Sequence, residues 1–522
     1  MRQMSLHKLG LAALAGATIA GCNFFLATYD GHDTSGGSGG SSSTASSSSS
    51  GSSGTGLSGG GGTGGTPPVP GRTLWSKAFG DSMADDAVNA VAIGAEDHVY
   101  LTGTSADLGR LGCDLADAGT GSGYLVELDA NGSCSWAFPF NGVGKAVAFG
   151  SDSNLVFLAG TFDSTLLIDP SWPVAPQIVD SFVAAFDRAS HELRWIRVLG
   201  DGALAGDQIL TSLSANGDGV AVGGTFTGSL TVKDSANTNS VATTADGEDA
   251  FVLLLGADGT FNWSFGVTSG GTMKMPQSAS DVALRPADRA VAITGTSRGD
   301  TKFNGDLKPG SAEENVFVAA CDAAKTTLFT RLLGDSAVQW GRRVAFDGLG
   351  RTVIGGEFGG VFEPGGVGSS GGLSNMGGVD IFLARYDDDG LPVGLAMQIG
   401  LDASSTSAVT LGGMALFEGP KKHIIAAGGF LGSIQGTGLE MESSLGGSDA
   451  WVARIEFDLS KGTWIRRFGD DADQAVTAAA VDSQGNTIIV GHFQGGIDFD
   501  DTMSPHTNTG SGNDIFVAKL AP

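Results

Sequence analysis

Trp464-Ile-Arg-Arg-Phe-Gly-Asp470 decides the fold, because this phrase returns along the chain. An aromatic residue, four intervening residues and a Gly-Asp pair recur at Trp75–Asp81, Trp195–Asp201 and Phe329–Asp335. Weaker copies begin at Trp136, Trp263 and Leu395. Self-similarity at a fixed period identifies a repeat architecture. Residues 72–522 are therefore interpreted as seven copies of one unit.

A second phrase, a polar residue followed by apolar ones, has the same period. It begins at Asp180, Asp249, Asn315, Asp380, Asp449 and Asp514, with a degraded copy at Gly123. Between the phrases, short β-rich runs alternate with turn residues, and no stretch keeps a helical period. In the last unit we expect strands at 475–482, 487–493 and 514–520. Elsewhere a further hairpin turn leads to a fourth strand, so the pattern predicts an all-β, seven-bladed β-propeller with four-stranded antiparallel blades.

The two ends of the repeat array are out of phase with each other. The array starts on a lone fourth strand, 74–80, and stops after a third strand, 514–520. We therefore expect the N-terminal strand (74–80) to join the last blade and close the ring, which leaves no open edge between the first and last blades.

These phrases resemble those of bacterial β-propeller repeat proteins common on myxobacterial and related envelopes. The resemblance covers Arg72 to Pro522 and implies the propeller fold. That family has no shared catalytic residue set, so the resemblance implies no catalytic residue here. The fold also supports envelope lipoproteins that act as assembly scaffolds, which is compatible with an interaction role.

The N-terminus has the layout of a secretory signal peptide, residues 1–21. Arg2 and Lys8 precede an apolar run, 9–20, which is too short for a comfortable membrane-spanning helix. The run ends in Ile19-Ala-Gly-Cys22, which resembles the bacterial lipobox. That resemblance implies a lipidated Cys22, a membrane anchor, and, from Asn23, sorting to the outer membrane, with the head in the periplasm or on the surface. The alternative is an ordinary secreted protein.

Residues 22–71 are expected to form a flexible tether, because 34–66 consists almost only of Ser, Gly and Thr.

The charge of the chain limits the partners that the propeller can bind. The chain has 29 Lys and Arg against 56 Asp and Glu, a net charge of −27. Nucleic-acid affinity depends on neutralising phosphates with cations, so we expect no nucleic-acid partner. The head is expected to be monomeric.

The Gly-Asp phrase is expected to collect carboxylates on one face of the ring, where the blade-to-blade loops lie. The members of this acidic face are Asp81, Asp201, Asp335, Asp470 and Asp471. The last long loop adds Asp498, Asp500 and Asp501, oxygen ligands of the kind that Ca²⁺ takes. A calcium site and a solvated acidic rim are the two interpretations of this loop. No other cofactor is expected.

Cysteine use fits an exported protein. Cys113 and Cys134 lie close together in the first unit and predict a disulfide in an oxidising compartment. Cys321 lies inside a third strand and is expected to be a buried apolar residue. The histidines show no zinc-like pairing with these cysteines.

Two functional classes remain open. The first is an envelope-anchored scaffold whose long loops, at 163–179, 227–248, 359–379, 431–448 and 494–513, contact a protein or glycan partner. The second is a polysaccharide hydrolase or lyase with a carboxylate site in the funnel of the propeller. Paired carboxylates and aromatic platforms in the funnel would favour the enzyme. No catalytic residue is predicted from the sequence.

Overall fold

The computed structural model describes residues 69–522 except 81–84, 106–121, 177, 201–205, 235–237, 244–246, 273, 367–370, 402–408, 500–504 and 509. The signal peptide, Cys22 and most of the tether lie outside the described residues, so the expectations for them stay predictions. Within the described part, no helix is long and apolar enough to cross a bilayer.

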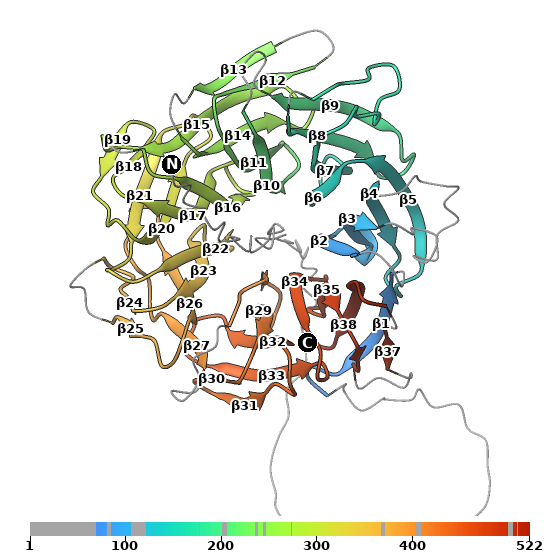
Figure 1. Ribbon diagram of the computed structural model, residues 1–522, viewed down its shortest axis with the longest axis vertical. Coiled ribbons are helices and arrows are strands. Elements are labelled where there is room, and N and C mark those ends of the chain that lie inside the picture. The colour runs from blue at the N-terminus through green and yellow to red at the C-terminus, as the bar shows by residue number, and fades with distance from the viewer. Residues whose placement is uncertain are drawn as a thin grey trace, which may run out of the picture.

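Seven antiparallel sheets, each with a four-stranded core, stand in a ring, as Figure 1 shows. This confirms the predicted seven-bladed β-propeller. In six blades the strands run outward in chain order, and in all seven the first strand of the unit lies nearest the centre of the ring. The one helical element in the described residues is a 3-10 turn, η1 (Ala95–Asp97).

Each of the first four blades takes its four core strands from one unit, in chain order. Blade 1 contains β2 (Ala87–Ile93), β3 (Val99–Ser105), β4 (Ser122–Leu128) and β5 (Cys134–Asn141). Blade 2 contains β6 (Val143–Gly150), β7 (Leu155–Phe162), β8 (Asp180–Asp187) and β9 (Leu193–Gly200). Blade 3 contains β10 (Gln208–Ala215), β11 (Gly219–Phe226), β14 (Asp249–Gly256) and β15 (Phe261–Ser269). Blade 4 contains β16 (Gln277–Leu284), β17 (Val291–Arg298), β20 (Glu314–Cys321) and β21 (Thr327–Leu333).

The last three blades follow the same order until the chain ends. Blade 5 contains β22 (Gln339–Phe346), β23 (Thr352–Phe358), β26 (Asp380–Tyr386) and β27 (Met397–Leu401). Blade 6 contains β28 (Gly413–Phe417), β29 (His423–Phe430), β32 (Asp449–Glu456) and β33 (Gly462–Phe468). Blade 7 contains β34 (Gln474–Val481), β35 (Thr487–Phe493), β38 (Asp514–Leu520) and β1 (Thr73–Phe79).

Blade 7 is completed by the N-terminal strand, which confirms the predicted closure of the ring. β1 runs antiparallel to β38, with Trp75 opposite Lys519. Beyond the strands, the Gly71 N–H donates to the Ala521 carbonyl (3.0 Å) and the Ala521 N–H to the Arg72 carbonyl (2.7 Å). The two ends of the array are therefore joined by the same ladder that joins strands inside every other blade.

The aromatic residue of the repeated phrase docks on the next blade. Trp195, on the outer strand β9, donates its indole N–H to the Ala257 carbonyl in the turn between β14 and β15 (2.7 Å). Its ring lies against Gly259 (φ +79), where an added Cβ would come within 2.7 Å of Trp195 Cδ2. Arg197 donates to the Gly259 carbonyl as well (2.8 Å). Glycine is needed here for both its left-handed backbone and its lack of a side chain.

The same dock recurs around the ring with small variations. The pairs are Trp75 with Ala130 and Gly132, Trp263 with Ala323, Phe329 with Gly390, and Trp464 with Gly71. Between blades 1 and 2, Trp136 stacks instead on the His191 ring, with centroids 4.4 Å apart. The aromatic series is therefore an inter-blade packing girdle, as expected from aromatics on repeated strands.

The glycine of the phrase makes room for the polar residue that opens the third strand. At Gly469 (φ +153), a Cβ would lie 2.4 Å from Asp449 Oδ1. Asp449 is fully buried and its Oδ2 accepts the Leu445 N–H (3.1 Å) and Arg467 Nη1 (2.8 Å). Equivalent close approaches are Gly80 to Asp514, Gly334 to Asn315, and Gly400 to Asp380. The two repeated phrases thus meet in space and fasten the third strand, the outer strand and the long loop together.

Several long loops fold as hairpins. β12 (Ser229–Lys233) and β13 (Thr238–Thr243) extend blade 2 by pairing with β9. β18 (Thr301–Phe303) and β19 (Asp306–Lys308) extend blade 3, and β30 (Ser433–Gly436) and β31 (Leu439–Ser443) extend blade 5. Two shorter hairpins are β24 (Val361–Phe362) with β25 (Leu373–Ser374), and β36 (Gly496–Ile497) with β37 (His506–Thr507). In blades 2, 3 and 5, the hairpin of the following blade covers an outer strand, whose free N–H and C=O groups would otherwise be exposed.

We predict that Trp75→Ala destabilises the closed ring by about 3 kcal/mol, since it removes the aromatic contact between the last and first blades and leaves the Ala130 carbonyl without its indole donor. Urea unfolding would measure the change. Leu74→Ala is the matched control on the same strand: Leu74 is 44% exposed, so its loss should change stability by less than about 0.5 kcal/mol. Equal effects of the two substitutions would contradict the docking role.

Candidate functional site

Two faces of the ring differ in how the chain turns. The loops between blades and between second and third strands emerge on one face, which we name the long-loop face. The tight turns between first and second and between third and fourth strands emerge on the other, the short-turn face. In the antiparallel order of every blade, each inner strand begins at the long-loop face and ends at the short-turn face.

Six inner strands share a β-bulge at the same position, and the residue in the bulge is not the same in every blade. The register between first and second strands skips one residue in each of these blades. The skipped residues are Asn89, Lys145, Thr211, Ser280, Arg342 and Thr477. Bulges redirect side chains and commonly stand beside functional sites. The shared bulge also gives a register in which equivalent positions can be compared.

Blade 5 departs from the other blades at three neighbouring positions. Two residues before the bulge it carries Trp340, where the others carry Ala87, Val143, Ile209, Ser278 and Ala475. Opposite Trp340 on the second strand it carries Glu357, where the others carry Thr104, Thr161, Thr225, Thr296 and His492. Its bulge residue is Arg342. We name Trp340, Arg342 and Glu357 the axial triad.

The axial triad is held rigidly by its neighbours. Arg342 donates from Nη2 (2.6 Å) and Nε (3.0 Å) to Glu357 Oε2, and its guanidinium carbon lies over the Trp340 ring, 5.4 Å from the centroid. Glu357 Oε1 accepts the Leu411 N–H of blade 6 (2.9 Å). The Trp340 indole N–H donates to Glu314 of blade 4. Three blades therefore fix these side chains near the long-loop end of the channel.

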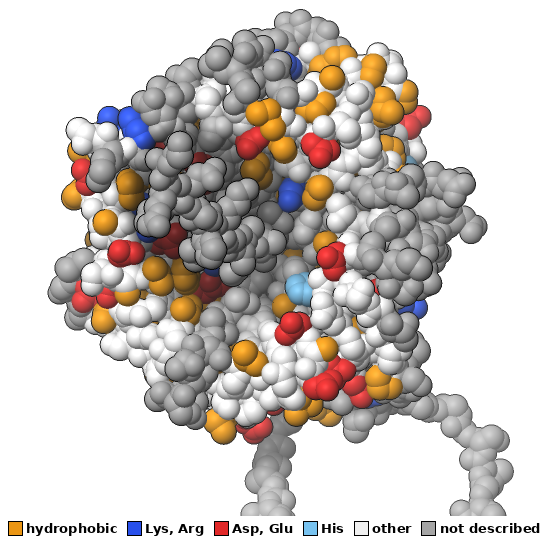
Figure 2. Space-filling view, viewed as in Figure 1, with side chains coloured by type: hydrophobic (Ala, Val, Ile, Leu, Met, Phe, Trp, Pro, Cys, Tyr) orange, Lys and Arg blue, Asp and Glu red, His pale blue; other side chains and the backbone are white. Residues whose placement is uncertain are grey.

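Other chemistry-bearing groups lie at equivalent heights in other blades. Lys145 occupies the bulge of blade 2, and burial lowers the pKa of its ammonium group. His492 stands opposite Ala475 in blade 7, and burial lowers its pKa although Asp473 and Asp85 oppose the shift. Figure 2 shows one face of the ring, hollowed at its centre, with basic, acidic and histidine side chains around the hollow.

Deeper in the ring, a buried polar chain crosses five blades. Asp281 of blade 4 accepts Ser212 Oγ of blade 3 (2.6 Å) and the Val344 N–H of blade 5 (2.9 Å). Arg343 Nη2 donates to the Gly412 carbonyl of blade 6 and to the Thr477 carbonyl of blade 7 (3.1 Å). Burial raises the pKa of Asp281 to about 6, while Arg343 and these hydrogen bonds oppose the shift. Among the described residues, Asp281 and Glu357 each bind groups of neighbouring blades at the axis.

The structure places only part of the predicted acidic face. Asp335 accepts the Ala337 N–H and the Val361 N–H, and Asp470 accepts the Ala472 N–H and the Gly496 N–H. These two residues cap the turn between blades and tie it to the long loop. Asp471 is exposed, and Asp81 and Asp201 lie outside the described residues.

The proposed calcium loop is only partly covered. Asp498 directly follows β36, whereas Asp500 and Asp501 lie outside the described residues, so the loop stays a prediction. Among the residues that the structure describes, no cluster of three or more His, Cys, Asp or Glu side chains could hold a metal ion.

The cysteines can be followed in part. Cys134, at the start of β5, is disulfide-bonded, but its predicted partner Cys113 lies outside the described residues, so that pairing stays a prediction. Cys321 is a free, buried cysteine at the end of β20, as expected. Burial raises the pKa of its thiol to about 11.

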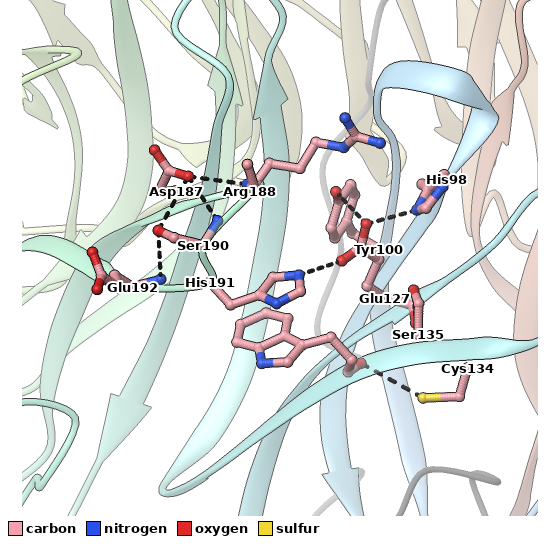
Figure 3. A network of polar contacts seen from close by, with 12 residues as sticks. His98, Tyr100, Glu127, Cys134, Ser135, Asp187, Arg188, Ser190, His191 and Glu192 are labelled. Carbon is pink, nitrogen blue, oxygen red and sulfur yellow. Dashed lines mark hydrogen bonds and ion pairs between the residues drawn. The ribbon is translucent and has the colours of Figure 1, made fainter.

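A second polar cluster, on the short-turn face, joins blades 1 and 2 (Figure 3). Glu127 is its centre, with a side chain only 4% exposed. One carboxylate oxygen accepts His98 Nδ1 (2.6 Å) and the Tyr100 hydroxyl (2.9 Å), and the other accepts His191 Nε2 of blade 2 (2.9 Å). Burial first, and the Glu127 charge second, raise the pKa of Tyr100. Because both of its carboxylate oxygens accept hydrogen bonds, Glu127 links blades 1 and 2 and holds the His191 ring in its stack with Trp136.

Neither polar cluster was found from the sequence. Glu357 replaces the threonine of a Gly-Thr-Phe phrase found at 160–162 and 224–226, but this departure alone did not indicate a site, and Glu127, His98 and His191 come from three separate segments. A signal did exist for the axial triad: once the inner strands are aligned on their bulge, blade 5 alone of the six bulged blades has an aromatic residue beside a charged one. That alignment requires the register, which the sequence does not show.

No protein-family model and no curated protein matches the chain. Among solved structures it is similar to a chain of the mitotic checkpoint complex, with 13% identity and a TM-score of 0.42, over 89% of this chain and 97% of that one. It is also similar to the acylaminoacyl peptidase of Pyrococcus horikoshii (10% identity, TM-score 0.40, 81% of this chain and 52% of that one). The NanB sialidase of Streptococcus pneumoniae gives 9% identity and a TM-score of 0.36, over 86% and 70%. Similarities of this size carry no inference about activity.

Asp281 predicts a distinct dependence of stability on pH. The pKa of Asp281 in the folded state is about 6, above its ordinary value of 3.8, so the folded state holds this proton more tightly than the unfolded state does. The free energy of unfolding therefore falls as the pH rises from about 4 through 6. Asp281→Asn removes this titration. The free energy of unfolding of the variant, minus that of the unmodified chain, should therefore rise by up to about 3 kcal/mol from pH 4 to pH 7. Urea unfolding at several pH values measures this difference. Asp389→Asn, in an exposed turn, is the control; if both variants gave the same pH profile, the role of Asp281 would be refuted.

Proposed function

We propose that the chain is an outer-membrane lipoprotein that presents a rigid propeller as a binding scaffold, with the axial triad at the centre of its binding surface. The axial triad is the observation that carries this proposal. Repetition of a scaffold explains why most equivalent positions in the other bulged blades hold small or aliphatic side chains or threonine, but it does not explain Trp340, Arg342 and Glu357 in one blade. A departure near the axis, on the face with the long loops, is where a ligand site would be built.

Binding is favoured over hydrolysis by the state of the axis carboxylates. Glycoside hydrolysis uses two carboxyl groups flanking the bond, one of them as a proton donor. Glu357 is paired with Arg342 and accepts a backbone N–H, and Asp281 is buried between three blades. Groups used in this way hold the scaffold together and are poorly placed to exchange protons with a substrate.

The anchoring part of the proposal rests on the N-terminal sequence. Cys22→Ser should release the protein from membranes, because lipidation needs the thiol and the apolar run before it is short for a membrane span. Fractionation of cells would measure the share of protein left in the membrane pellet. Retention of the variant in the pellet would count against the lipid anchor, while leaving the binding surface untouched.

The location of the binding surface can be tested on intact cells. A photo-crosslinking amino acid at Ser278, which is equivalent to Trp340 in blade 4, should capture a protein or glycan partner, and Trp340→Leu should abolish the capture. The same amino acid at Leu307, on the outer hairpin and 53% exposed, is the control and should capture nothing. Capture from Leu307 but not from Ser278 would contradict the proposed surface. Turnover in a glycan screen without stable capture would favour the hydrolase.

A further inference from the structure

Exposed leucines gather on the short-turn face at blade 5. Leu349 is 73% exposed in the turn between β22 and β23, and Leu391 (53%) and Leu395 (63%) lie between β26 and β27. In the short turns that the structure describes, no other large apolar side chain is so exposed. Arg285 of blade 4 donates from one nitrogen to both turns (2.8 and 2.6 Å), so the turns are neighbours. We name Leu349, Leu391 and Leu395 the leucine patch.

Other blades carry polar residues at the places of these leucines. The Leu391 carbonyl accepts the Asp387 N–H at the end of its turn (3.0 Å), and Leu349 donates its N–H to Asp347 within its turn (3.0 Å). The same backbone bonds close the turns of other blades. There the equivalent residues are Thr260 and Thr326 for Leu391, and Gln484 for Leu349. The fold of these turns therefore does not require leucine.

The leucine patch continues into the turns of blade 6, which lies beside blade 5 in the ring (Figure 1). Gly348 donates its N–H to Glu418 Oε1 (2.8 Å), which ties the turn of Leu349 to the turn between β28 and β29. Lys422 of that second turn lies over the Phe457 ring, 5.4 Å from the centroid, in the turn between β32 and β33. The short turns of the two blades thus form one continuous surface.

This surface does not share the large negative charge of the chain. Seven Lys and Arg and seven Asp and Glu occur in its segments 69–72, 347–351, 385–396, 418–422 and 454–461, whereas the whole chain has 29 against 56. Lys421, Lys422 and Lys461 are exposed on the turns of blade 6. Lysine stems lie well along apolar surfaces while the ammonium groups reach outward, where phosphate oxygens are suitable partners.

The chain enters the propeller on the same face. β1 begins where β38 ends, with Thr73 opposite Leu520, so residues 69–72 lie at the short-turn face. Arg466 of blade 6 donates to the Pro70 carbonyl (3.2 Å), which fixes this segment against blade 6. The preceding residues, 1–68, contain Cys22. The proposed lipid anchor is therefore joined to the propeller on the face that carries the leucine patch.

We propose that the short-turn face of blades 5 and 6 docks on the phospholipid bilayer, with the leucine patch in the interface and Lys421, Lys422 and Lys461 at the lipid phosphates. Exposed apolar residues rimmed by polar ones mark interaction surfaces, and leucines beside lysines suit a lipid interface. The inference rests on the proposed lipid anchor and adds the orientation of the propeller.

Docking and anchoring support each other. Three leucines bind a bilayer weakly by themselves, so stable docking depends on a tether that keeps the propeller within roughly 40 Å of the anchor. Loss of the anchor should therefore still release the protein. In the docked orientation the long-loop face, with the axial triad, points away from the membrane and toward a partner.

The test uses the full chain, purified from membranes and reconstituted in vesicles of phosphatidylethanolamine and phosphatidylglycerol. A dansyl amino acid replaces Leu395, and quenching by spin-labelled phospholipid measures its contact with the bilayer. The same amino acid at Leu167, an exposed residue on the long-loop face, is the control. Quenching at Leu395 should exceed that at Leu167 at least about twofold, since only the leucine patch enters the interface. Equal quenching at the two positions would overturn the inference.

Variants show whether the leucines cause the contact. Leu349→Gln combined with Leu391→Thr introduces the side chains of the equivalent turns, so the fold should be kept, and quenching at Leu395 should fall about twofold or more. Leu307→Gln, on the outer hairpin of blade 3, is the matched control and should leave quenching unchanged. The thermal midpoint of each variant checks its folding. Unchanged quenching in the folded double variant would refute the role of the leucine patch.

A protein partner is the other occupant that could cover these leucines. A photo-crosslinking amino acid at Leu349 on intact cells should give phospholipid adducts. A protein adduct in their place would overturn the assignment to the membrane.

Failure of this inference can be separated from failure of the lipid anchor. Release of Cys22→Ser from membranes, together with equal quenching at Leu395 and Leu167, would keep the anchor and reject the docking. Retention of Cys22→Ser in the membrane pellet, together with strong quenching at Leu395, would reject the lipid anchor and keep the docking surface.

Discussion

The contact between an outer-strand aromatic and the following blade's turn is the interaction on which the ring depends. Trp195 shows its full form: a ring against a left-handed glycine, an indole N–H on a turn carbonyl, and Arg197 on the glycine carbonyl. A single blade cannot bury both faces of its sheet, so stability comes from its neighbours. Because Trp75 makes this contact across the point where the chain begins and ends, the last blade is held like all the others.

A ring held in this way can carry one exceptional blade. Six inner strands share a bulge, and most positions around it are small or carry threonine, whereas blade 5 has Trp340, Arg342 and Glu357. Contacts from blades 4 and 6, through Glu314 and Leu411, fix these side chains before any ligand arrives. Such preorganisation lowers the entropy lost on binding. The rigid ring of repeated blades thus holds the three unusual side chains of blade 5 in a fixed arrangement.

Sequence reasoning predicted the scaffold better than the site. The strands 487–493 and 514–520 and the closing strand were found within a residue or two, because alternating patterns and turn residues are local signals. Of the aspartates in the repeated phrase, Asp335 and Asp470 cap turns between blades. Two of the long loops expected to contact a partner, 227–248 and 431–448, contain hairpins that pair with a neighbouring blade, which the sequence analysis did not predict. Their partner strands belong to another unit, so no local pattern reports the pairing.

The sequence by itself determined the repeat period, the strand order and the closure of the ring. These features depend on short patterns and on the phase of the two ends of the array. Only the tertiary structure decided which side chains meet. Arg342 reaches the axis through a bulge, Glu127 joins His98 and His191 across two blades, and Asp281 binds groups from blades 3 and 5. These contacts depend on register and on packing between blades, which are properties of the closed ring and not of any one repeat.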